Sequence, residues 1–215
     1  MKNTIRTLIF LTSFFAFFAI FKFVGLDLLN VPEKYIIIAG LVSYIVAVGV
    51  QALLRNIYII TRLKKQAILF SLPVKAFSMR DRLNMHTLPL IVTVLPWIYK
   101  RPALGDALFT IVILAIYIAF AEVIQRFGEK TLKINFFSKG IAISGYDFRP
   151  DFNLPFQTEN APGYYDFSRI IYFKADENNI SITQRLDFSQ INVEASEENL
   201  ARIAAILIEK GVVPE

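Results

Sequence analysis

The sequence predicts an α-helical membrane domain, with four transmembrane helices in two hairpins, followed by a small α+β domain with a C-terminal helix. Three observations support this prediction: the composition, four apolar runs within residues 1–128, and a change of hydrophobic period after them. Of the 215 residues, 55% are hydrophobic and only 19% are charged, whereas about 25% are charged in an ordinary soluble domain. The composition therefore indicates a membrane protein with the lipid bilayer as a partner.

The charge is unevenly distributed along the chain. Residues 1–130 carry 15 Lys and Arg against 6 Asp and Glu, whereas residues 131–215 carry 8 against 12. The basic excess belongs to the hydrophobic part, so it does not indicate a nucleic-acid partner. The chain has no Cys, which excludes disulfides, thiolate metal ligands and a Cys nucleophile.

The first two apolar runs predict a helical hairpin with helices over residues 7–24 and 33–56. The first run has about 18 residues, close to the minimum that crosses a hydrocarbon core of ~30 Å. Lys2 and Arg6 precede it, as in a signal peptide, but no small-residue cleavage site follows. We therefore expect an uncleaved anchor. Arg55 marks the polar exit of the second helix, and residues 57–60 are able to continue it.

The next two runs predict a second hairpin, with helices over residues 83–99 and 103–125 joined by a tight connection. Pro89 and Pro96 interrupt the first of these runs. Whether residues 83–99 fully span the membrane, or are kinked or re-entrant, is left open by the sequence. Near the exit of the last helix, Glu122 and Arg126 have the spacing of an i,i+4 ion pair.

Residues 61–82 alternate basic and large apolar side chains between two apolar runs. An anionic headgroup layer attracts the basic side chains while the apolar ones dip into it, so we expect an interfacial segment. The alternative is that the charges only set the orientation and the apolar residues pack within a loop. The candidate lipid-interface residues are Lys64, Lys65, Lys75, Arg80 and Arg82.

Basic residues gather at the N-terminus, in the interfacial segment and after the fourth helix. By the positive-inside rule, both termini and the interfacial segment lie in the cytoplasm. The expected location is therefore the bacterial inner membrane, which the chain crosses several times.

Residues 129–215 are predicted to form a separate cytoplasmic domain. Strands are expected over residues 132–138 and 141–147 around a turn at Lys139-Gly140, over residues 170–174 and 180–184 around a turn at 176–179, and over residues 191–195. Residues 148–163 contain three Pro and read as a long loop. Ser196 and an acidic first turn begin a last helix, whose buried stripe is Leu200, Ile203, Ala204 and Leu207.

The segments KINFFSKGIAIS and YYDFSRIIYFKADENNISI, followed by a strand and an amphipathic helix, resemble the PH-like domains of the YcxB-like bacterial membrane proteins. In that family an aromatic and acidic element follows the first β-hairpin, and residues 165–170 occupy its place here. The resemblance covers roughly residues 126–211 and implies a membrane-anchored interaction domain. This chain departs from the family in having two preceding helical hairpins where members often have one, and in its long 148–163 insertion.

The sequence contains no nucleophile elbow, metalloprotease, P-loop or dinucleotide-binding motif. We therefore expect a non-enzymatic protein that acts by binding, through the PH-like domain and the interfacial segment, without cofactor or metal. The candidate partner-binding residues are Phe148, Arg149, Phe152, Phe156, Tyr164, Tyr165, Asp166 and Arg169. The alternative reading of the charged residues around this loop, Asp147 included, is a solvated face.

An immunity or self-protection protein that blocks a membrane-active toxin is one concrete form of this function. The alternative is a subunit of a membrane transporter or channel, for which Ser13, Ser43 and Thr110 are weak candidates within the spans. The lone His86 is expected to pack at the interface, with a proton-sensitive role as the alternative. Asp106 is expected to favour the N-terminal end of its helix.

Overall fold

The computed structural model describes residues 3–23, 33–64, 66–74, 77–99, 103–150, 160–184 and 190–215. The helices are α1 (Asn3–Phe23), α2 (Glu33–Leu63), α3 (Met79–Tyr99), α4 (Leu104–Thr131) and α5 (Glu197–Glu209), with a 3-10 turn at Phe167–Arg169. The strands are β1 (Ile68–Pro73), β2 (Lys133–Phe137), β3 (Gly140–Ser144), β4 (Gly163–Asp166), β5 (Ile170–Asp176), β6 (Asn179–Gln184), β7 (Gln190–Glu194) and β8 (Val213–Pro214).

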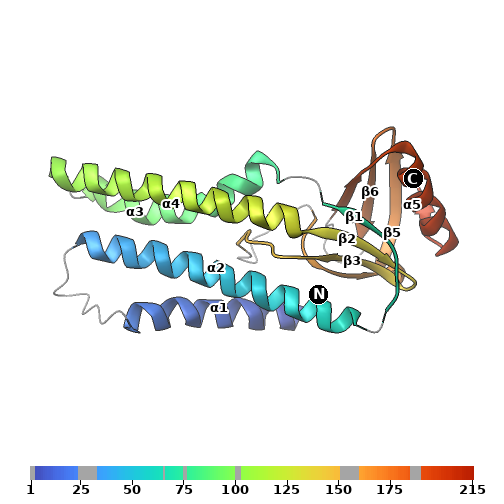
Figure 1. Ribbon diagram of the computed structural model, residues 1–215, viewed down its shortest axis with the longest axis horizontal. Coiled ribbons are helices and arrows are strands. Elements are labelled where there is room, and N and C mark those ends of the chain that lie inside the picture. Colours follow the sequence, from blue (N-terminus) through green and yellow to red (C-terminus); the bar gives the residue numbers. More distant parts are fainter. Residues whose placement is uncertain are drawn as a thin grey trace.

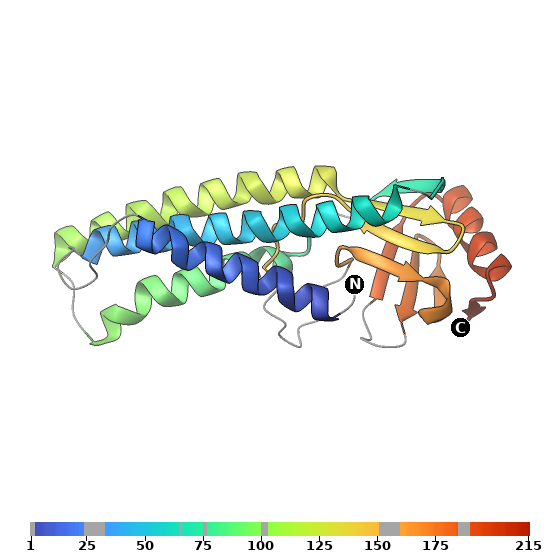
Figure 2. The same ribbon diagram turned by 90° about the horizontal axis from the view of Figure 1, so that it is seen from below.

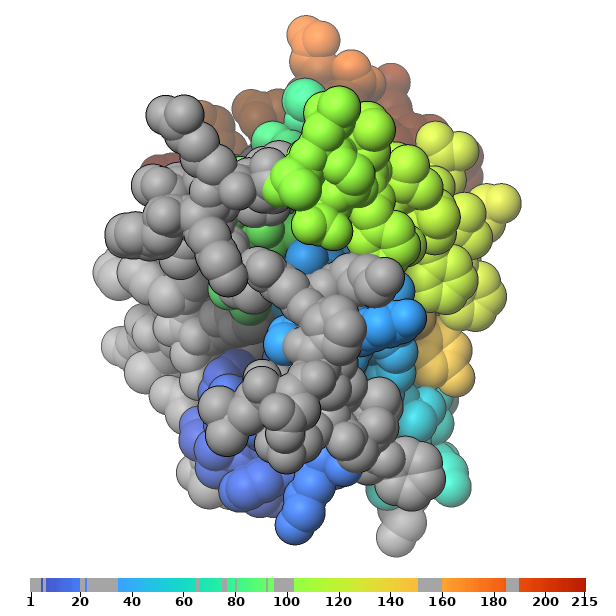
Figure 3. Space-filling model, turned by 90° about the vertical axis from the view of Figure 1, so that its left-hand side faces the viewer, coloured from blue at the N-terminus to red at the C-terminus, as the bar shows by residue number. Residues whose placement is uncertain are grey.

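The first four helices lie side by side along the long axis, and the strands gather at one end of them (Figures 1 and 2). Within each hairpin one helix runs away from the strands and the next returns. The start of α1, the end of α2 and the C-terminal domain therefore lie at the same end of the molecule. Figure 3 shows the opposite end, where α2 and α4 lie next to each other.

Two of these helices are long and apolar enough to span a membrane by length and composition. They cover Tyr35–Leu63 and Leu104–Thr131, with mean hydropathies of 2.3 and 2.5. The buried residues of α4 recur every three or four positions, as in a helix that packs along one face. They are Thr110, Leu114, Tyr117, Ala121, Gln125 and Gly128. The outer face of α4 is also apolar, with Leu108, Ile111 and Ile116 exposed. Over residues 107–120, every exposed residue of this helix is apolar.

Four helices extend beyond a predicted bound, and α1 does so by beginning at Asn3. The last turns of α2 pack Ile59 against the sheet residues Phe137 and Ala142. Helix α4 continues to Thr131 and leads directly into β2. Helix α3 begins at Met79 because Ser78 caps it: the Asp81 backbone N–H donates to the Ser78 hydroxyl at 3.2 Å, and that hydroxyl donates to the Asp81 carboxylate at 3.0 Å.

The segment predicted to lie at the membrane interface contains a strand that the sequence analysis did not predict. Residues 68–73 form β1, which pairs antiparallel with β2 in the sheet β1-β2-β3-β4. Alternate residues of β1 turn inward: Phe70 and Leu72 pack against the core, whereas Leu69 and Ser71 are exposed. The division at residue 128 therefore omitted one strand, and the α3–α4 hairpin is inserted between β1 and β2.

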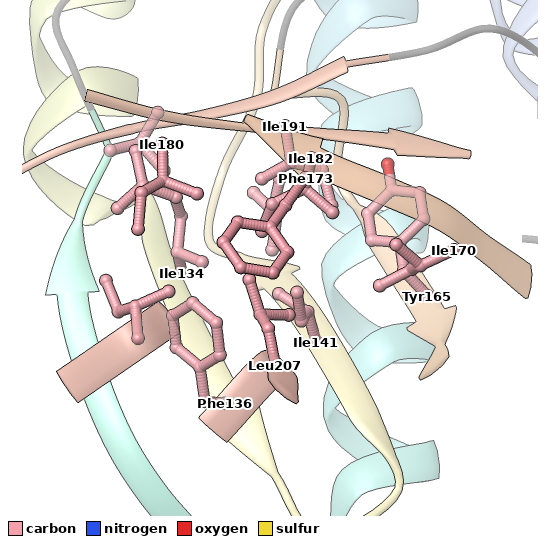
Figure 4. Close-up of a cluster of buried hydrophobic side chains, with 14 of the residues drawn as sticks. Ile134, Phe136, Ile141, Tyr165, Ile170, Phe173, Ile180, Ile182, Ile191 and Leu207 are labelled. Carbon is pink, nitrogen blue, oxygen red and sulfur yellow. The ribbon is translucent and has the colours of Figure 1, made fainter. Parts of the chain in front are cut away.

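The second sheet has the order β7-β6-β5-β8, in which β8 runs parallel to β5. Figure 4 shows the core between the sheets, where Phe136 and Ile141 of one sheet face Phe173 and Ile182 of the other. Helix α5 closes this core with Leu207.

The two predicted β-hairpins, the strand near residue 191 and the C-terminal helix are confirmed. The buried stripe of that helix is confirmed as well, with Ala204 half-buried. Strands β4 and β8 were not predicted. Ser196 occupies the N-cap position of α5 as expected, but its side chain makes no capping hydrogen bond.

Candidate functional site: a polar junction and an apolar pocket

A group of buried polar side chains joins the helices to the β domain. This junction consists of Arg55 on α2, Asp81 in the first turn of α3, and Asp147 and Arg149 in the segment after β3. Their exposed fractions are 5%, 8%, 2% and 3%, respectively. Charged residues are almost never this deeply buried unless they are paired, so the partners of each one define the junction.

Arg149 is enclosed by oxygen atoms and an aromatic ring. Its Nε and Nη2 donate to the carboxylate of Asp147 at 2.9–3.1 Å, and its Nη1 lies 3.4 Å from the Asp81 carboxylate. Nη2 also donates to the carbonyl of Asn160 at 3.0 Å. The guanidinium stacks over the ring of Phe77 at 4.4 Å from its centroid. One side chain thus links three separate segments.

Arg55 and Asn56 attach the end of α2 to the same segment. Arg55 Nη2 donates to the carbonyls of Asp147 and Arg149 at 2.7 and 3.0 Å. The Asn56 side-chain oxygen accepts from the backbone N–H of Gly145 at 3.1 Å. Arg55 was predicted to mark the polar exit of its helix, but the apolar span continues to Leu63 and Arg55 holds the β domain instead.

The electrostatics of the junction favour the charged form of Asp147. Burial by itself raises the pKa of this carboxyl, but the charges of Arg149 and Arg55 and the hydrogen bonds from Arg149 outweigh that effect. The pKa of Asp147 therefore lies below its ordinary value. The same carboxylate raises the pKa of Arg149 against the opposing effect of burial. Both groups remain ionised as an internal pair.

Two glycines allow the backbones to approach closely here. Gly145 has φ +127°, and a Cβ at this position would lie 2.4 Å from the carbonyl oxygen of Thr131. A Cβ on Gly128 would lie 2.7 Å from the carbonyl oxygen of Tyr146. The backbone of the segment after β3 therefore lies directly against the last turn of α4.

Next to the junction, α3 and α4 are joined by ion pairs. Arg82 lies 2.7 Å from the carboxylates of both Glu122 and Glu129. The Nε2 atom of His86, also on α3, lies 3.6 Å from the carboxylate of Glu122. The predicted pairing of Glu122 with Arg126 was wrong, because the exposed Arg126 lies on the outer face of α4 while Glu122 turns to the neighbouring helix.

The predicted partner-binding residues do not form one surface. Arg149 and Tyr165 are buried, so the alternative of a solvated face is wrong for Arg149 and Asp147. Phe148, Tyr164 and Asp166 are half-buried, and Arg169 is exposed. Phe148 packs against the helices, whereas Tyr164 lies under the guanidinium of Arg62 at 5.3 Å. Phe152 and Phe156 lie outside the described residues.

The predicted lipid-interface residues also separate. Lys64 is exposed after the last turn of α2. Arg82 is directed to Glu122 and Glu129 and links two helices. Lys65, Lys75 and the side chain of Arg80 lie outside what the structure describes.

An apolar pocket of about 360 Å³ lies beside the junction. It is lined by residues of α1, α2 and α3 and by Pro150, which follows Arg149 directly; the main apolar wall is Phe10, Phe14, Phe17, Ala47, Val48 and Leu88.

Sequence reasoning missed both the pocket and the role of Asp81. The available signal for the junction was an Asp and an Arg two residues apart directly after a strand. Among the described residues, no group of three or more His, Cys, Asp or Glu is placed to hold a metal ion.

Comparison with protein-family models, with curated proteins and with solved structures finds no match to this chain.

Proposed function

We propose that this chain is a multi-pass protein of the bacterial inner membrane that acts by binding, with four transmembrane helices and a cytoplasmic PH-like domain. The two long apolar helices support a membrane location. The start of α1, the end of α2 and the β domain lie at one end of the molecule, and the basic residues cluster there. This arrangement supports a single cytoplasmic face.

One observation carries the choice of binding over catalysis. Among the described residues, the charged groups of Arg149, Asp147 and Asp81 are deeply buried and are satisfied by internal partners. A catalytic acid, base or nucleophile has to reach a substrate atom. These charged groups hold the helices and the β domain together. This supports a role in positioning a binding domain at the membrane.

The proposed recognition surface is the part of the predicted set that stays accessible: Tyr164, Asp166 and Arg169, with Arg62 beside Tyr164. Tyr and Arg are the residues most often found as anchors of protein interfaces. The partner is proposed to be a protein, and a membrane-active toxin that the chain neutralises is one form of it.

A photo-crosslinking amino acid placed at Arg169 tests this proposal in membranes of the native host. We expect one adduct of discrete mass, which mass spectrometry identifies. The same amino acid at the exposed Lys174 of β5 serves as the matched position. Tyr164→Ala should abolish the adduct, whereas Tyr172→Ala, a change at another half-buried tyrosine of the domain, should retain it. No adduct at Arg169, or equal adducts at both positions, contradicts a recognition surface here.

A transporter or channel subunit remains the second candidate, and one observation favours it. Ser13, Ser43 and Thr110, the weak polar candidates within the spans, are 6%, 0% and 3% exposed. The hydroxyl groups of Ser13 and Thr110 donate to carbonyls of their own helices. The Ser43 hydroxyl has no hydrogen-bond partner among the described residues. Ion flux through proteoliposomes that Ser43→Ala abolishes would favour transport, and an absence of flux would favour binding.

A further inference from the structure

The outer face of α4 changes from apolar to cationic where the helix reaches the β domain (Figure 1). Over residues 107–124 every exposed side chain is apolar, and this stretch covers about 27 Å at ~1.5 Å per residue. The hydrocarbon core of a bilayer is ~30 Å thick. Arg126 and Lys130 follow directly and are exposed. With the apolar stretch in the hydrocarbon, both cations lie at the level of the lipid headgroups.

The acidic residues in this part of α4 turn away from the outer face. Glu122 and Glu129 are the acidic residues of its last three turns, and both lie 2.7 Å from Arg82 on α3. Arg126 and Lys130 are four positions apart, so they share the exposed face of the helix. The exposed charges of these turns are therefore both positive, which favours an anionic partner.

Three aromatic rings mark the same level. Phe127 is 53% exposed, and its ring centroid lies 6.1 Å from that of Tyr146 and 6.4 Å from that of Phe148. Those two rings, in the segment after β3, are themselves stacked 6.5 Å apart. Aromatic side chains concentrate at membrane–water interfaces, where their apolar bodies contact lipid. Rings from two separate segments thus indicate the same interface as the change of character along α4.

We propose that Arg126 and Lys130 bind the phosphate group of one anionic phospholipid of the cytoplasmic leaflet, whose acyl chain lies along Val123 and Phe127. The inference rests on the proposed membrane location and adds to it a preferred lipid with its contact residues. Anionic lipids attract Lys and Arg close to the membrane surface, and Arg binds phosphate through paired N–H donors. Neither cation belongs to the lipid-interface set predicted from the sequence, which precedes or begins α3.

Lipid quenching of a single tryptophan tests this contact in the full-length chain reconstituted into vesicles. Trp97→Phe removes the natural Trp. Val123→Trp then reports beside the cations, and Val112→Trp, 55% exposed and three turns away on the same face, is the matched control. The vesicles contain equal amounts of phosphatidylglycerol and phosphatidylcholine, and one of the two lipids carries brominated acyl chains. At position 123 we expect phosphatidylglycerol to be preferred roughly fivefold. At position 112 the two lipids should quench equally.

Charge-removing variants identify the residues that create the preference. Arg126→Gln combined with Lys130→Gln should bring quenching by the two lipids at position 123 to equality. Lys139→Gln combined with Lys174→Gln removes the same charge from two exposed positions of the β domain. This control should keep the preference, because neither lysine lies on the outer face of α4.

Three results would overturn the proposal: equal quenching by both lipids at position 123, a preference that survives the loss of both cations, or an equal preference at position 112. Should Val123→Trp fail to fold, Phe120→Trp, 53% exposed and one turn earlier, takes its place as reporter. An absence of quenching by either lipid at position 112 would contradict the membrane location on which the inference rests, so the two failures are distinguishable.

Discussion

The guanidinium of Arg149 lies 3.4 Å from the carboxylate of Asp81, although most of the α3–α4 hairpin and two strands separate the two residues in sequence. Asp81 stands in the first turn of α3, and Arg149 follows β3. Because Asp147 holds the other edge of the same guanidinium, the contact fixes the start of the α3–α4 hairpin against the β domain.

Arg149→Met should therefore destabilise the chain more than any change at an exposed arginine. Removing one partner of a buried ion pair leaves an uncompensated charge and costs about 3–5 kcal/mol. We expect a markedly lower midpoint in denaturant unfolding of the purified protein. Arg169→Met, at an exposed position of the same domain, should leave the midpoint unchanged. Equal midpoints for the two variants would show that Arg149 is not held as described.

The pH dependence of stability should reveal Asp147. Its pKa is lower in the folded chain than in the unfolded one, so the unfolded state takes up the proton first as the pH falls. The stabilisation is fully present above the unfolded pKa of ~3.9 and is lost as the pH falls through the lower folded value. Asp147→Asn lacks this contribution.

Unfolding of wild type and Asp147→Asn should be compared from pH 7 to pH 3. The wild type should be more stable at pH 7, and the difference should narrow below about pH 4. Other carboxylates affect both proteins equally and cancel in this difference. A difference that stays constant over the whole range would mean that the Asp147 carboxylate is not stabilised by its neighbours.

Gly145→Ala should be destabilising, because φ +127° is unfavourable for a side chain and the new Cβ would meet the Thr131 carbonyl oxygen. Strain of this kind costs about 1–3 kcal/mol. Gly49→Ala is the matched control, since nothing lies within 4 Å of a Cβ on that helical glycine. Thermal unfolding should show a lower midpoint for the first variant and an equal or higher midpoint for the second. The reverse order would contradict the close approach of β3 and α4.

Local patterns were enough to predict much of this fold. β-rich segments on both sides of a turn at Lys139-Gly140 located the first hairpin, because cross-strand neighbours there are close in sequence. The 3.6-residue period of Leu200, Ile203 and Leu207 located the closing helix. Continuous apolar runs located the long helices. In each case the residues that decide the structure lie within about one element of one another.

Features that depend on distant residues were not predictable in this way. Strand β1 pairs with β2 only after the whole α3–α4 hairpin has intervened. Its apolar residues stand between two basic clusters, and that arrangement matched a lipid surface as well as a strand. Arg149 was expected at the surface because burial of an Arg requires partners, and Asp81 is brought to it only by the tertiary fold. The pocket depends on packing among α1, α2 and α3.

Because the α3–α4 hairpin is inserted between two paired strands, we expect the β domain to fold without it. Pro73 and Lys133 are directly paired across β1 and β2, and the Val74 N–H donates to the Leu132 carbonyl at 3.1 Å. A short turn can therefore replace residues 75–131. Residues 66–74 joined in this way to 132–215 should fold with a cooperative melt. A fragment of residues 131–215 alone, which lacks β1, should melt at a lower temperature; if the two melt alike, β1 is not part of the domain.

Cysteine labelling at the two ends of the helices tests the proposed topology most directly. The chain has no Cys of its own, so Lys64→Cys and Ala103→Cys each introduce one exposed thiol, after α2 and before α4. A membrane-impermeant maleimide is applied to intact cells whose outer membrane has been made permeable. We expect labelling at position 103, and labelling at position 64 only after the inner membrane is also opened. Labelling of position 64 in intact cells, or protection of both positions, would contradict a membrane-spanning chain with its β domain in the cytoplasm.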